Sequence, residues 1–306
     1  MNKQTRTHIR YTRVACAVIV LGVIIGFGVY LLGKSAGKRD AKADSKGSSS
    51  YSYPDVSFED SKGEQKLSGD LTALKDAMNA KIADYGGEWS VYLKNMGTGE
   101  YFSINDRDVY PASMIKLFAM GACYQQIEDG KINENDWYST IHSMAALSNN
   151  NSFNKMIWTI GKDYLTKWCR DNGYTRTAQY HGLFPSDNGE GLQTSDKKNV
   201  TCASDVGHML EDIYNGKCVS KQASEKMLKI LTEQYWRNKI PMGIPYGPII
   251  ANKSGDTDDV SHDGAIVYSD GADYVLVIMC DYPQNASLQG HRFIELSKMA
   301  YEYFNK

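Results

Sequence analysis

Apolar positions form one long uncharged run near the N-terminus of this chain and, from residue 69 onward, short segments with alternating helical and strand-like spacing. Helical spacing predicts a helix from Asp70 to about Tyr85 and a last helix from about Ser287 to Phe304. Runs rich in β-branched and aromatic residues predict five strands, at Trp89–Asn95, Tyr101–Asn105, Ile249–Gly255, Val260–Ser269 and Asp273–Asp281. The stretch from Ser113 to about Leu231 is predicted to be mainly helical.

Strands on both sides of a helical stretch predict an α/β (α+β) domain, with one antiparallel sheet, helices on its faces and a helical lobe beside it. The 238 residues from Gly69 to Lys306 suit a single domain of this kind.

The uncharged run, Val14–Leu32, has 19 residues and would be about 28 Å long as a helix, enough to cross a bilayer core. We predict one transmembrane anchor at 14–32, a cytoplasmic N-terminus at 1–13 and a flexible linker at 33–68. A cleaved signal peptide is the alternative, although its apolar region is usually shorter. Basic residues flank the run on both sides, so the positive-inside rule does not fix its orientation.

Charge and cysteine content exclude several classes of function. The chain has 34 basic and 36 acidic residues, a net charge of −2, so it lacks the excess of basic residues that is typical of nucleic-acid-binding proteins. Cys16 is in the apolar run, and the five cysteines of the domain lack metal-ligand spacing. We predict that they are buried small apolar residues, with one disulfide as the alternative. No metal or cofactor is predicted, and we expect a monomer.

A serine and a lysine three residues apart occur four times, starting at Ser35, Ser113, Ser152 and Ser195. Only Ser113 opens a long apolar run at helical spacing, so we expect it at a helix N-terminus with Lys116 on the same face. Free N–H groups and the helix dipole there favour the negative charge that develops when a serine attacks a carbonyl. The alternative is that Ser113 only caps a helix.

Two further strings follow Ser113-Met114-Ile115-Lys116 in the chain: Ser148-Asn149-Asn150 and Lys253-Ser254-Gly255. With the strand pair before Ser113, this set resembles the class A β-lactamase and penicillin-binding serine hydrolase family over residues 69–306. Asn149 replaces the usual aspartate of the second string. The resemblance implies a β-lactamase/transpeptidase-like fold, with the site where the helical lobe meets the sheet.

The same resemblance implies a role for each motif residue. Ser113 is acylated, Lys116 takes its proton, and Ser148 passes a proton to the departing nitrogen. Backbone N–H groups of Ser113 and Asp256 form the oxyanion hole. The substrate-binding residues are Asn150 for the substrate amide, Lys253 for its carboxylate, Ser254 as a hydroxyl donor, and Gly255, where a side chain would crowd the substrate.

Two departures from the family pattern stand out. The interval from Ser113 to Ser148 is only 35 residues, which predicts a reduced or rebuilt wall of the cleft. Trp137 and Tyr138 are candidates for that wall, with core packing as the alternative. The expected loop at 180–201 lacks the family's E-x-x-x-N pattern, and its one glutamate, Glu190, is the candidate base for deacylation.

The leading hypothesis is a membrane-anchored serine hydrolase of class A β-lactamase type that is acylated by β-lactams and hydrolyses them. The alternatives are a peptidase acting on D-Ala-D-Ala ends of wall peptides, and a non-catalytic module that binds β-lactams or wall peptides. A module that senses β-lactams would need an output domain inside the cell, and residues 1–13 are too few to fold one. Because the family acts on cell-wall peptides or on antibiotics that mimic them, we expect the catalytic domain on the outer side of the cell membrane.

Overall fold

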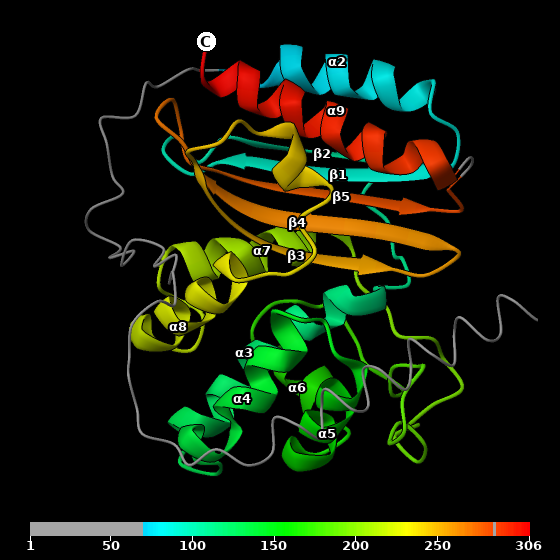
Figure 1. Ribbon diagram of the computed structural model, residues 1–306, viewed down its shortest axis with the longest axis vertical. Helices are drawn as coiled ribbons and strands as arrows, with labels where there is room; N and C mark the ends of the chain where they lie inside the picture. Colours follow the sequence, from blue (N-terminus) through cyan, green and yellow to red (C-terminus); the bar gives the residue numbers. More distant parts are fainter. Residues whose placement is uncertain (1–69, 284–285) are drawn as a thin grey trace, which may run out of the picture. The chain divides into compact units, whose positions relative to one another are not determined.

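A five-stranded antiparallel sheet lies at the centre of the described residues, 70–283 and 286–306 of a computed structural model (Figure 1). Its order is β2-β1-β5-β4-β3, so β3 is an edge strand. The strands are β1 (Glu88–Asn95), β2 (Tyr101–Ile104), β3 (Ile249–Asp256), β4 (Val260–Tyr268) and β5 (Tyr274–Asp281). All five predicted strands are present, each with its ends within one residue of the prediction.

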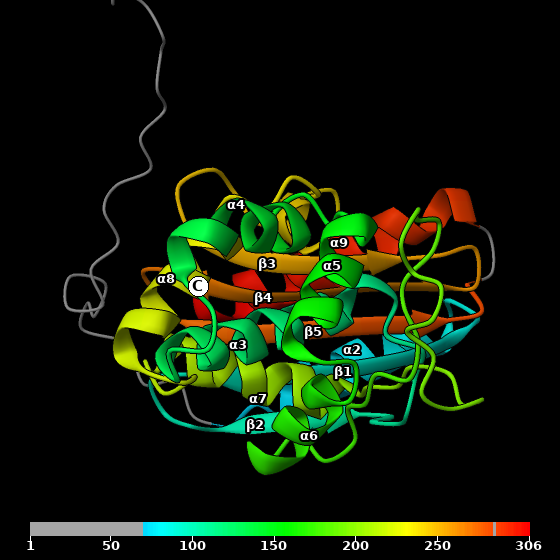
Figure 2. The ribbon, with the colours of Figure 1, turned by 90° about the horizontal axis from the view of Figure 1, so that it is seen from below.

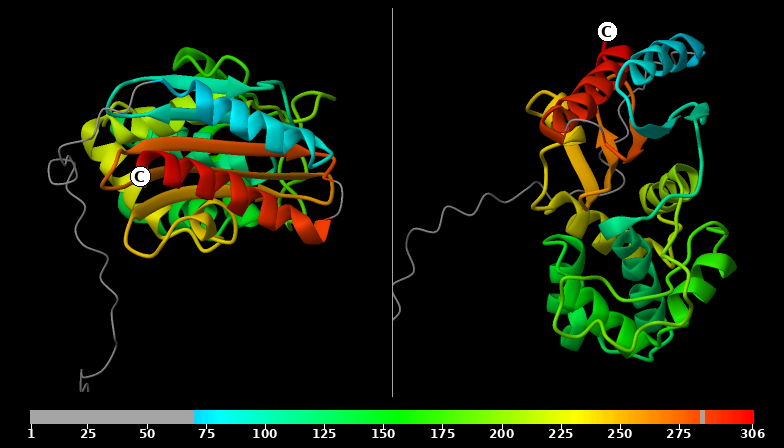
Figure 3. Two further views of the ribbon diagram at one scale, coloured as in Figure 1. Left: turned by 90° about the horizontal axis from the view of Figure 1, so that it is seen from above. Right: turned by 90° about the vertical axis from the view of Figure 1, so that its right-hand side faces the viewer.

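Both faces of the sheet are buried, which explains why β5 is an almost continuous apolar run. Successive side chains of a strand point to opposite faces. One set, Val275, Val277 and Met279, packs against the helical lobe, and the other, Tyr274, Leu276, Ile278 and Cys280, packs against α2 (Thr72–Ala83) and α9 (Ala286–Phe304). Figure 3 shows these two helices together on one face of the sheet.

Six helices form the lobe on the other face. They are α3 (Ile115–Glu128), α4 (Glu134–Ala145), α5 (Asn150–Ile160), α6 (Tyr164–Asp171), α7 (Ala203–Tyr214) and α8 (Lys221–Thr232). Helix α3 is apolar almost all round and lies among the others, as Figure 2 shows. The predicted helical stretch is therefore interrupted, most of all by an irregular segment between α6 and α7 that contains the expected loop. Two 3₁₀ helices, η1 (Ala112–Met114) and η2 (Ile240–Gly243), complete the fold.

The five cysteines of the domain are free and buried, which confirms the prediction of small apolar residues. The predicted anchor at 14–32 and linker at 33–68 lie outside the described residues. Among residues 70–283 and 286–306, no helix has both the length and the apolar character needed to cross a membrane.

Candidate active site

Ser113 lies in the 3₁₀ turn η1, and the α-helix begins two residues later than predicted, at Ile115. The difference arises because Ala112 has a positive φ of 45°, a conformation that regular helices exclude. The amide of Met114 donates to the carbonyl of Pro111 at 2.9 Å and closes the turn. The nucleophile candidate is thus presented on a tight, locally strained turn.

His262 of β4 anchors the chain that leads into this turn. Its Nδ1 accepts from the Cys280 amide at 3.3 Å, so its Nε2 donates to the Tyr110 carbonyl at 2.8 Å. Burial lowers the pKa of His262 to about 4, which keeps the ring neutral. This histidine is a packed residue that positions the approach to Ser113.

Lys116 connects the first two motifs. Its Nζ lies 2.9 Å from Ser113 Oγ and 2.8 Å from Asn150 Oδ1, and it also donates to the Ser148 carbonyl. The side chain is fully buried, and burial, followed by the charge of Lys253, lowers its pKa to about 6. At neutral pH the amine is therefore largely unprotonated and can accept the Ser113 proton.

Ser148 turns both its carbonyl and its hydroxyl towards Lys116 because its backbone has a positive φ of 59°. The next residue, Asn149, caps α5 by accepting a hydrogen bond from the Ser152 amide at 2.8 Å. Aspartate and asparagine are about equally good helix caps. Asparagine therefore fills this structural position as aspartate would, and the departure from the usual motif leaves the Lys116 contacts intact.

Lys253 brings the third motif to the second. Its Nζ donates to Ser148 Oγ at 3.0 Å and to the Ser254 carbonyl at 2.7 Å. Burial lowers its pKa to about 7, against the opposing effect of Asp263. Ser148 thus stands between two lysine amines, which suits a group that relays protons.

Gly255 is where β3 touches the nucleophile turn. A Cβ atom there would lie 2.9 Å from the Ser113 nitrogen and 3.0 Å from both the Met114 nitrogen and the Pro111 carbonyl oxygen. Backbone atoms cannot move aside as a flexible side chain can. Glycine is therefore required by contact with the turn itself, in addition to any role towards substrate.

Replacing Gly255 by alanine should displace the Ser113 turn and lower the free energy of unfolding by about 1–3 kcal/mol, the usual cost of overpacking. The acylation rate should fall by more than the loss of folded protein explains, because the substitution moves the nucleophile. Thermal unfolding and the acylation rate measure the two effects. Gly290→Ala is the matched control, since a Cβ there meets no atom within 4 Å. Normal acylation by folded Gly255→Ala protein would contradict the close approach.

The predicted loop is held against α5 beside this site. Asn150 Nδ2 donates to the Pro185 carbonyl at 3.2 Å, and the buried Asn154 side chain bonds the Leu183 backbone in both directions at 2.8 and 2.9 Å. Phe184 stands four residues before Asn188, where the E-x-x-x-N pattern would have its glutamate, and its side chain is exposed.

Glu190 does not join the Lys116 network. Its side chain is exposed and makes no hydrogen bond or ion pair with any residue that the structure describes. Its neighbour Gly191 lies against the ring of Trp158, two turns along α5 from Asn150. The candidate base therefore stays a prediction without a supporting contact.

Trp137 and Tyr138 take different places. Trp137 packs against the core with Lys155 Nζ 4.9 Å from its ring centre, which supports the core-packing alternative. Tyr138 is exposed beside His142.

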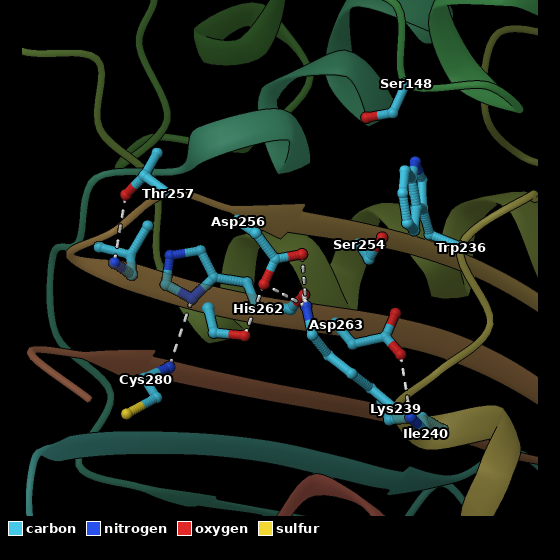
Figure 4. A network of polar contacts seen from close by, with 12 residues as sticks. Ser148, Trp236, Lys239, Ile240, Ser254, Asp256, Thr257, His262, Asp263 and Cys280 are labelled. Carbon is cyan, nitrogen blue, oxygen red and sulfur yellow. Dashed lines mark hydrogen bonds and ion pairs between the residues drawn. The ribbon is translucent and has the colours of Figure 1, made fainter. Parts of the chain in front are cut away.

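Sequence reasoning missed a cluster of polar side chains beside Ser254 that contains Lys239, Asp256 and Asp263 (Figure 4). An aspartate inside the apolar strand β4 was the available signal for Asp263, whereas nothing in the sequence marked Lys239.

Comparisons with known proteins bear on the family and the fold of this chain. The model of a family described as the beta-lactamase enzyme family matches residues 73–139 and 135–304. A search of curated proteins gives no match.

Among solved structures, PBP-A is similar with a TM-score of 0.69 and 21% identity, covering 78% of this chain and 98% of that one. A beta-lactamase from Chitinophaga pinensis has a TM-score of 0.67 and 17% identity, with 76% and 100% covered. A point mutant of PBP-A, solved as an acyl-enzyme complex with penicillin G, has a TM-score of 0.66 and 20% identity, with 76% and 97% covered.

Proposed function

The chain belongs to the beta-lactamase enzyme family, and we propose from this premise that it is a serine hydrolase acylated at Ser113 by β-lactams, which it then releases slowly. The observation that supports this most is the continuous set of contacts from Ser113 through Lys116 and Ser148 to Lys253. The penicillin acyl-enzyme of a structurally similar protein is compatible with the proposal.

Acylation follows from these contacts. The neutral Lys116 amine takes the proton of Ser113 as its Oγ attacks the β-lactam carbonyl, and the C–N bond of the ring then breaks. Ser148, within reach of both lysines, delivers a proton to the departing nitrogen. Lys253 holds the substrate carboxylate, and backbone amides of Ser113 and Asp256 stabilise the oxyanion.

A peptidase acting on the D-Ala-D-Ala ends of wall peptides is the second candidate. It is favoured by the loop beside Asn150, where Phe184 stands in the place of a deacylating glutamate. The same acylation machinery serves a peptide carbonyl, and a long-lived β-lactam adduct is compatible with this function.

We also propose that residues 14–32 anchor the chain in the cell membrane with the catalytic domain outside. The support is the 19-residue uncharged run and the need for access to wall peptides or β-lactams.

The decisive experiment incubates the full-length chain with a chromogenic cephalosporin and separately with a fluorescent penicillin, following colour and covalent label over time. The proposal predicts label on one site and slow colour release. Rapid cleavage of a D-Ala-D-Ala peptide in a parallel assay would favour the second candidate. Absence of any covalent label from the fluorescent penicillin would contradict both candidates.

The acylation rate should depend on pH in a way that differs between benzylpenicillin and its methyl ester. Lysine is uncharged above its pKa, so the rate with either compound should rise through about pH 6 as Lys116 loses its proton. With benzylpenicillin the rate should fall again above about pH 7, as Lys253 loses the charge that holds the carboxylate. The ester, which has no carboxylate, should lack that fall. Identical profiles measured between pH 5 and 9 would contradict these roles.

A further inference from the structure

Two acidic side chains flank Ser254 on one face of the sheet. Residues two apart on a strand share a face, so Asp256 stands beside Ser254 on β3. Asp263 of β4 is paired directly opposite Ser254. Figure 4 shows the three side chains together. Two acidic groups are not what a binding site for a ligand carboxylate requires, although Lys253 directly precedes Ser254 in the chain.

Lys239 is fully engaged by this cluster. Its Nζ donates to the two carboxylate oxygens of Asp256 at 2.7 and 2.8 Å and to the His262 carbonyl at 3.0 Å. These contacts use all three N–H bonds of an ammonium group. The Lys239 side chain is 5% exposed, whereas that of Asp256 is 56% exposed. The cation is thus covered, and its anionic partner faces the solvent.

Asp256 is itself fixed in place. Ser261, its partner in the β3–β4 register, donates from Oγ to Asp256 Oδ1 at 2.7 Å. A carboxylate held by a serine hydroxyl and an ammonium has the partners that a bound ligand carboxylate would seek.

The cluster also acts on Lys253. Besides burial, which lowers the pKa of Lys253, the charge of Asp263 raises it, that of Lys239 lowers it, and that of Asp256 raises it. The two lysines and two aspartates therefore share one electrostatic environment.

We propose that Asp256 is a specificity-determining residue, an internal carboxylate that occupies Lys239 and so weakens the preference of the site for carboxylated substrates. A ligand carboxylate is then held by Lys253, without help from the second lysine. The site accordingly accepts neutral acyl donors more readily, relative to carboxylated ones, than it would with Lys239 free. This inference rests on the proposed acylation of Ser113 and on Lys253 as the carboxylate-binding residue.

The test compares benzylpenicillin with its methyl ester on the full-length chain, because the two compounds differ only in the carboxylate. The measured quantity is the ratio of the second-order acylation rate constants, acid over ester, obtained by intact mass. Asp256→Asn keeps the shape and removes the charge, and it should raise the ratio about tenfold, the effect of one added charge-assisted hydrogen bond. Lys239→Met leaves Asp256 without its counterion and should lower the ratio.

The double variant Asp256→Asn/Lys239→Met should return the ratio to near the wild-type value, since both charges are gone. Asp258→Asn is the matched control, because it removes the same charge from the exposed β3–β4 turn and should change the ratio less than about twofold. Lys253→Ala should lower the ratio.

Because both compounds are tested on the same preparation, a partly unfolded variant does not alter the ratio. An unchanged ratio in Asp256→Asn, or a gain that persists fully in the double variant, overturns the inference while leaving the proposed function standing. If Asp256→Asn does not fold, an unchanged or raised ratio in Lys239→Met overturns it. Absence of any adduct on the wild-type chain with both compounds contradicts the proposed function itself, and the inference with it.

Discussion

Replacing Ser113 by alanine should abolish covalent labelling by penicillin. Lys116, Ser148 and Lys253 all converge on this hydroxyl directly or through one another, and removing a nucleophile from such a unit typically costs on the order of 10⁶-fold in rate. Intact-mass analysis should show one adduct on the wild-type chain, mapped to the peptide that contains Ser113, and none on the variant.

Ser152 gives the matched control for this prediction. It also begins a serine and lysine pair at the same spacing, yet it lies inside α5 with its hydroxyl 3.2 Å from Ser143 Oγ. Ser152→Ala should be labelled at the wild-type rate. An adduct that survives in Ser113→Ala would mean that another residue is the nucleophile.

Deacylation should be the slow step, giving a burst of one product equivalent per enzyme, slow steady turnover and a long-lived adduct. Acylation has its base in Lys116, whereas the loop beside Asn150 brings no carboxylate into the Lys116 network. General-base assistance typically contributes 10²- to 10⁴-fold, so its absence is sufficient to make hydrolysis rate-limiting. Stopped-flow absorbance with a chromogenic cephalosporin, and adduct decay followed by mass, measure the two phases.

Two substitutions locate the missing base. Phe184→Glu places a carboxylate next to Pro185, whose carbonyl is held by Asn150, and should shorten the adduct lifetime by at least about tenfold. Glu190→Gln should leave the lifetime unchanged, since Glu190 contacts no residue of the network. A much longer lifetime in Glu190→Gln would show that Glu190 reaches the acyl group after a movement of the loop. Fast turnover without a burst in the wild-type chain would contradict the account of a slow second step.

The sequence by itself determined the strands of the sheet and the order of the three motifs. Strand ends agreed within one residue because β5 and its neighbours are buried on both faces, and an apolar run bounded by turn residues is a local signal. The burial of the five cysteines in the domain was predicted for a related reason, since it depended on no distant partner. The roles of Ser113, Lys116 and Lys253 came from resemblance, and the structure supplies the contacts between them.

Only the tertiary structure decided how the site is assembled. Lys116 and Ser148 are 32 positions apart in the chain, and Lys253 and Ser148 are 105 apart, so their contacts depend on how the lobe packs against β3. The positive φ of Ala112 and Ser148 is imposed by that packing rather than by residue preference. The Lys239–Asp256 ion pair had no local signal, because a lysine in a connecting segment has no periodicity that reveals its partner. Electrostatic neighbours are set by folding across long sequence separations, whereas burial leaves its pattern in the sequence itself.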